Sequence, residues 1–104
     1  MFNRRKAYRQ ELNIEGVVTL DRNNIGVTIK DISKTGIAIV TNKNLKVSDV
    51  IDIMFKDNGI LFQEKGKIVR IQQLGNLFLY GCEFLSLNSN IEKYIKTKQN
   101  IENA

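Results

Sequence analysis

Six short apolar segments, separated by turn-forming residues and followed by one stretch of helical periodicity, limit most strongly the folds open to this chain. β-branched and aromatic residues recur in these segments with the two-residue period of a strand, so we expect strands at residues 11–20, 25–32, 37–41, 50–55, 60–73 and 77–85. Turn residues at 21–24 and the pair Asn58-Gly59 favour tight antiparallel hairpins. Gly16 predicts a bulge nearby in the first strand, and Gly66 predicts a bulge or a sharp bend in the fifth.

The residues after the sixth strand change to the periodicity of a helix. Ser89 and Glu92 form a capping-box pattern. Apolar residues then recur at helical spacing, namely Ile91, Tyr94, Ile95 and Ile101. We expect one amphipathic helix at residues 89–101, whose apolar stripe covers the chain's own sheet or binds a partner. We favour the first alternative, because an isolated helix of this length is only marginally stable in water.

The order of these elements predicts a mainly β fold: a small six-stranded antiparallel β-barrel with one C-terminal α-helix as a lid. The chain has 104 residues, 42% of them hydrophobic, which suits one modest core. We therefore expect a single domain over residues 1–104, with an N-terminal arm at about 1–11, the barrel at about 12–87 and the helix at about 89–101. No apolar run is long enough to span a bilayer, and the N-terminus lacks the apolar core of a signal peptide, so we expect a cytoplasmic protein.

The residue types that are missing narrow the chemistry. Histidine is absent and Cys82 is the single cysteine, so we expect no metal site, no cofactor and no enzyme activity. Cys82 lies among aromatic residues on a strand, which favours a buried structural thiol over a nucleophile. The net charge of +5 favours an anionic partner.

Two polar clusters stand out from this background. Arg4, Arg5 and Arg9 gather in the arm, which is either a binding segment or a basic terminus that aids solubility. The stretch Asp31-x-Ser33-x-x-Gly36 joins the second and third strands. Asp, Ser and Gly are common in such corners, and Gly36 can take a positive φ there. By the two-residue period, Asp31 shares a face with Val27 and Ile29 and lies where that apolar face ends.

The two clusters together resemble the PilZ domain, a bacterial family that binds the second messenger cyclic di-GMP (c-di-GMP). Arg5-x-x-x-Arg9 precedes the first strand, and Asp31-x-Ser33-x-x-Gly36 follows the second. Either motif alone arises easily by chance, but their order, separation and strand context agree with the family over essentially the whole chain. The resemblance implies a split-barrel fold and a nucleotide-binding role in second messenger signalling.

The resemblance also assigns roles to single residues. Arg5 and Arg9 would bind phosphate and the guanine edge, Asp31 and Ser33 would contact guanine, and Gly36 would allow close approach of the backbone. An arginine at the position of Arg4 accompanies binding of an intercalated c-di-GMP dimer in similar proteins, so we expect two ligand molecules per site. The arm would close over the barrel rim when the ligand binds, and a downstream protein, in the motility or exopolysaccharide machinery, would read the changed surface.

Two other functions fit parts of the sequence. A small basic barrel could bind nucleic acid, but the strands show no exposed aromatic platform for stacking successive bases, so we do not favour nucleic acid as a partner. A PilZ-like adaptor that no longer binds the nucleotide is the other alternative. The complete set Arg5, Arg9, Asp31, Ser33 and Gly36 argues against it.

Overall fold

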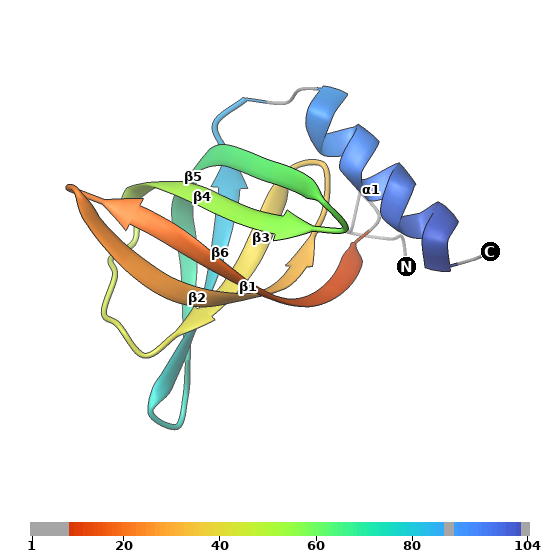
Figure 1. Cartoon of the computed structure of the whole chain (residues 1–104). Helices are drawn as coiled ribbons and strands as arrows, with labels where there is room; N and C mark the ends of the chain where they lie inside the picture. The colour runs from red at the N-terminus through yellow and green to blue at the C-terminus, as the bar shows by residue number, and fades with distance from the viewer. Residues whose placement is uncertain (1–8, 87–88, 103–104) are drawn as a thin grey trace, which may run out of the picture.

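The computed structural model describes residues 9–86 and 89–102, and it confirms the expected antiparallel barrel with one helix (Figure 1). The strands are β1 (Gln10–Leu20), β2 (Asn23–Ile32), β3 (Gly36–Thr41), β4 (Val50–Asp57), β5 (Ile60–Leu74) and β6 (Leu77–Phe84). They pair in the order β1-β2-β3-β6-β5-β4, and β4 pairs again with β1, which closes the barrel. The helix α1 (Ser89–Glu102) lies across one end of it.

The tight hairpin turns form where the sequence predicts them. Asp21 and Arg22 connect β1 to β2 with φ values of 50° and 69°, and Asn58 and Gly59 connect β4 to β5 with φ values of 53° and 78°. Two consecutive residues with positive φ are typical of a type I′ turn, whose twist matches that of the strands it joins. The hairpins are therefore local products of their turn residues.

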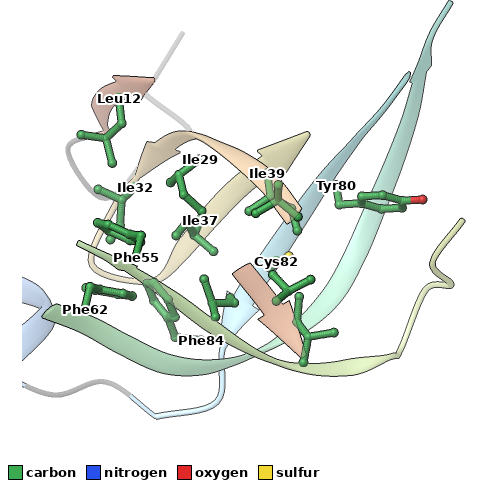
Figure 2. Packing of buried hydrophobic residues seen from close by; sticks show 14 of the residues in the cluster. Leu12, Ile29, Ile32, Ile37, Ile39, Phe55, Phe62, Tyr80, Cys82 and Phe84 are labelled. Atoms are coloured by element: carbon green, nitrogen blue, oxygen red, sulfur yellow. The ribbon is translucent and has the colours of Figure 1, made fainter. Parts of the chain in front are cut away.

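The barrel interior is filled by alternate residues of the strands (Figure 2). Ile51, Ile53 and Phe55 of β4 are buried, while Asp52 between them faces outward in an ion pair. Each such apolar side chain contributes roughly 1.5–3 kcal/mol by leaving water. On β6 the same alternation buries Tyr80, Cys82 and Phe84, with Phe78 partly buried beside them, as predicted.

The helix covers the barrel with its own apolar stripe. Ile91, Tyr94 and Ile95 are buried, and the Tyr94 ring makes edge contacts with Phe55 at 5.5 Å and Phe62 at 5.8 Å between centroids. This contact confirms the preferred alternative, that the helix packs on the chain's own barrel; the side chain of Ile101 lies outside the described residues. Within the described residues, no helix combines the length and apolar character needed to cross a bilayer.

The glycines expected to form bulges have another role. Gly16 and Gly66 lie in regular pairs with Val27 and Ile51, so no bulge lies at either glycine itself. A Cβ atom on Gly16 would lie 2.9 Å from the Met54 carbonyl oxygen. These glycines therefore make room for tight packing across the sheet. The register shifts occur elsewhere, between Glu11 and Ile14, between Ile29 and Asp31, and between Ile68 and Arg70.

Candidate functional site

The register shift in β2 sets the position of Asp31. Ile29 and Ile32 are both fully buried although they are three residues apart, which strict alternation does not allow. The shift between Ile29 and Asp31 directs Ile32 into the core and leaves the Asp31 side chain 28% exposed. The prediction that Asp31 shares the apolar face of Val27 and Ile29 is therefore wrong, because a bulge lies between them.

Arg9 binds Asp31 directly. The strand pairing of Gln10 with Ile32 brings the residues before and after it together. Arg9 donates from Nη2 to Asp31 Oδ1 at 2.6 Å and from Nε to the same oxygen at 3.1 Å. Asp31 Oδ2 and Arg9 Nη1 take part in neither bond. Both side chains are more than a quarter exposed, so a pair of this kind contributes only about 0.2–1 kcal/mol and can exchange partners.

Ser33 holds the corner between β2 and β3 in shape. Its Oγ accepts hydrogen bonds from the backbone N–H groups of Thr35 at 3.3 Å and Gly36 at 3.2 Å, and its own N–H donates to the Gly36 carbonyl at 2.8 Å. The residue is fully buried. In this conformation Ser33 therefore offers no exposed atom for the predicted contact with guanine, and its visible role is to stiffen the loop next to Asp31.

Gly36 is required for strand packing. Gly59 and Gly75 are the glycines with positive φ in the described residues, so the expected positive φ at Gly36 is wrong. A Cβ atom on Gly36 would lie only 2.4 Å from the Cys82 carbonyl oxygen. The glycine thus lets the start of β3 approach β6 closely, in register with Glu83. The close approach expected at this residue is found, but with a neighbouring strand.

The structure brings Arg9, Asp31, Ser33 and Gly36 to one corner of the barrel, at the junction of β1, β2 and β3. Arg4 and Arg5 lie outside the described residues. β1 begins at Gln10, so the last two residues of the expected arm belong to the strand.

A small hollow of about 150 Å³ adjoins this corner, and it contains a residue that the sequence analysis missed. Its walls include Arg9, Thr35 and Gly36 from the corner, together with Arg70 and Glu83 from β5 and β6. Nothing in the sequence distinguishes Arg70 from an ordinary solvated strand residue, because the pairing that brings it here depends on a register shift. A larger hollow of about 380 Å³ lies between β5 and α1, and none of the described motif residues Arg9, Asp31, Ser33 and Gly36 lines it.

Cys82 is excluded as a nucleophile by its surroundings. The side chain lies in the core on the inner face of β6 (Figure 2). Burial raises the pKa of the Cys82 thiol to about 12, because the thiolate loses its hydration there. The thiol therefore stays protonated near neutral pH and serves as a packed apolar group, as predicted.

The fold and the corner define a small closed β-barrel with an arginine–aspartate pair at its rim. The PilZ domain family matches residues 3–98, so the chain belongs to the PilZ family. No curated protein sequence matches the chain at a significant level.

Solved structures with the same fold share little sequence with this chain. YcgR from Escherichia coli, in complex with c-di-GMP, has a TM-score of 0.79 at 14% identity, covering 96% of this chain and 48% of YcgR. The Bacillus subtilis inhibitor of motility MotI/DgrA has a TM-score of 0.76 at 13% identity, covering 95% of this chain and 53% of that protein. The MrkH–c-di-GMP complex of K. pneumonia has a TM-score of 0.75 at 19% identity, covering 97% and 54%. The chain spans about half the length of these three proteins.

Proposed function

We propose that this chain is a receptor module for c-di-GMP that binds the nucleotide at the corner formed by Arg9, Asp31, Ser33 and Gly36. The observation that carries the proposal is the meeting of the Arg9 guanidinium and the Asp31 carboxylate beside the rigid Ser33–Gly36 loop. Membership of the PilZ family supports it, as do fold relatives that are c-di-GMP complexes. No chemical step is required of the site.

The chemistry of the ligand suits these groups. Guanine presents N1–H and N2–H₂ donors, which match a carboxylate, and N7 and O6 acceptors, which match an arginine fork. Asp31 Oδ2 and Arg9 Nη1, which the pair leaves out of its bonds, are the atoms we assign to these contacts. Each charge-assisted hydrogen bond contributes about 1.5–3 kcal/mol, so a few of them produce micromolar binding.

Ligand binding then draws the N-terminal arm against the barrel. Arg4 and Arg5 bring positive charge that the ligand phosphates neutralise, and guanidinium groups bind phosphate oxygens in pairs. We assign to Arg4 a contact with the second molecule of an intercalated dimer. The changed arm and rim would be read by a downstream protein; the likeness to an inhibitor of motility makes the motility machinery the first candidate.

Calorimetric titration of c-di-GMP into the protein tests the site. We expect micromolar or tighter binding by wild type and a loss of at least about tenfold in Arg5→Ala and in Asp31→Ala, since each removes a charge-assisted contact. Two molecules should bind per chain, and Arg4→Ala should reduce this number to one. Loss of binding in wild type, or unchanged affinity in both variants, would contradict the proposal.

The matched control for Asp31 is Asp52. It forms an ion pair with Lys65 at 2.7 Å on the barrel wall, outside the candidate site. Asp52→Ala should leave c-di-GMP affinity unchanged, which separates loss of the site from loss of an ion pair in general. The nucleic-acid alternative would be favoured if wild type did not bind c-di-GMP but bound single-stranded RNA or DNA in a filter-binding assay at physiological salt.

A further inference from the structure

The Arg70 guanidinium lies in the space that is left because Gly81 has no side chain. Arg70 pairs with Gly81 on β6, directly after the register shift in β5. The neighbours of Gly81, Tyr80 and Cys82, point into the core, so the Cα hydrogen positions of Gly81 face the outside of the barrel. A Cβ atom on Gly81 would lie 2.9 Å from Nη2, 3.1 Å from Cζ and 3.3 Å from Nε of Arg70. The guanidinium thus fills the space of the absent side chain.

These three distances also show how the guanidinium is oriented. Nη2, Cζ and Nε lie in one plane, and their distances from a Cβ atom on Gly81 differ by at most 0.4 Å. The guanidinium therefore packs on β6 with its flat face. Its other face points away from the strand, and the Arg70 residue is exposed. Within the described residues, the structure gives Arg70 no hydrogen bond and no ion pair, although Glu83 lines the same hollow.

The location of this flat cation connects it with the candidate site. The hollow above Gly81 is lined by Arg70 and also by Arg9, Thr35 and Gly36, so Arg70 shares this hollow with residues of the candidate corner. Because Arg9, the partner of Asp31, lines this hollow, we expect a ligand whose guanine edge binds at Asp31 to extend its ring system over it. A guanidinium stacks favourably on a flat aromatic ring, and lysine has no face with which to do so.

We propose that Arg70 is a stacking platform for a purine base of the bound nucleotide, and therefore an affinity-determining residue outside both motifs. This proposal rests on the proposed function. Gly81 is part of the same arrangement, because a side chain at this position would displace the Arg70 guanidinium from β6. The role is that of a flat surface rather than of a positive charge, and this distinction sets the experiment.

The test compares c-di-GMP affinity in wild type, Arg70→Ala and Arg70→Lys by calorimetry. We expect both variants to bind about tenfold more weakly, in line with the size of stacking contributions. The dependence of affinity on salt concentration should be the same in Arg70→Lys as in wild type, because the charge is kept. The matched control is Arg22→Lys, an exposed arginine in the β1–β2 turn, which should bind like wild type.

A second pair of variants tests whether the packing of Arg70 against Gly81 contributes to binding. Gly81→Val should weaken binding about as much as Arg70→Ala does, roughly tenfold. The same change should have no further effect when made in the Arg70→Ala background, because the group it displaces is gone. Far-ultraviolet circular dichroism and the thermal midpoint check that each variant is folded.

The outcomes separate the two proposals. Wild type that does not bind c-di-GMP overturns the proposed function. Wild type that binds, with Arg70→Lys equal to it, overturns stacking and leaves Arg70 as a simple charge. An undiminished affinity in Arg70→Ala removes Arg70 from the site altogether, as does an equal loss from Gly81→Val with and without Arg70.

Discussion

Single glycines, rather than catalytic groups, determine how closely the strands at the site approach one another. Gly36→Ala should destabilise the protein by about 1–3 kcal/mol or more, because its Cβ would lie 2.4 Å from the Cys82 carbonyl oxygen, a backbone atom that cannot move alone. Urea unfolding measures the change. The control is Gly26→Ala in the neighbouring strand, where a Cβ meets nothing within 4 Å. Equal stability of the two variants would contradict this role of Gly36.

The buried thiol makes a second prediction at the scale of one residue. Burial raises the pKa of Cys82 from 9.0 to about 12, so above pH 9 the unfolded chain releases a proton that the folded chain retains. Stability should therefore fall as the pH rises from 9 toward 12, by up to about 1.4 kcal/mol per pH unit from this group. At lower pH its contribution is constant.

Comparison with Cys82→Ala isolates this contribution. The variant loses packing at every pH, but it lacks the titrating thiol, so its unfolding free energy should decline less steeply than that of wild type above pH 9. Chemical unfolding at a series of pH values measures both slopes. Parallel slopes would show that the thiol titrates alike in the folded and unfolded chains.

At the scale of elements, the loop between β3 and β4 depends on one hydroxyl group. Tyr80 donates to the Lys43 carbonyl oxygen at 2.7 Å and accepts from the Leu45 N–H at 2.8 Å. Tyr80→Phe leaves the buried Leu45 N–H without an acceptor, which costs about 1–3 kcal/mol. Hydrogen exchange at the Leu45 amide should accelerate more than exchange at Ile53 in the barrel wall. Equal acceleration would mean that the hydroxyl stabilises the whole barrel and not the loop.

The elements that sequence analysis predicted are those with local causes. The Asn58-Gly59 turn requires only the φ preferences of its own residues, and α1 follows from a period that spans a few turns. The register shifts could be placed only roughly from the sequence, because a glycine in a strand marks either a bulge or a close neighbour, and only the facing strand decides which. Gly16 faces the Met54 carbonyl oxygen across the sheet, and no local pattern contains that contact.

The residues of the candidate site also differ in whether a local pattern reveals them. Arg9, Asp31, Ser33 and Gly36 could be found because they form two compact motifs. Arg70 could not, since its proximity to them depends on pairing with Gly81 across a long hairpin and on the shift before it. The structural roles of Ser33 and Gly36 could not be predicted from the sequence either. Ser33 accepts hydrogen bonds from the backbone of its own loop, and Gly36 makes room for the Cys82 backbone.

At the scale of the whole molecule, the proposed closure of the arm predicts a change in protease sensitivity. Arg4, Arg5 and Lys6 are trypsin sites in the N-terminal segment. If c-di-GMP draws this segment against the barrel, a concentration about 100 times the dissociation constant should slow cleavage there by tenfold or more, as the accessible fraction falls with site occupancy. Mass spectrometry of the early fragments measures the rate at each site.

The control for this experiment lies in the same chain. Lys43 and Lys46 belong to the exposed loop between β3 and β4, away from the Arg9–Asp31 corner, and cleavage after them reports the stability of the rest of the fold. A ligand that merely stabilised the folded state would make global unfolding rarer and so slow cleavage in both regions. Closure of the arm should instead protect the N-terminal sites selectively, in wild type but not in Asp31→Ala. Binding without selective protection would mean that the nucleotide occupies the corner while the arm takes no part in enclosing it.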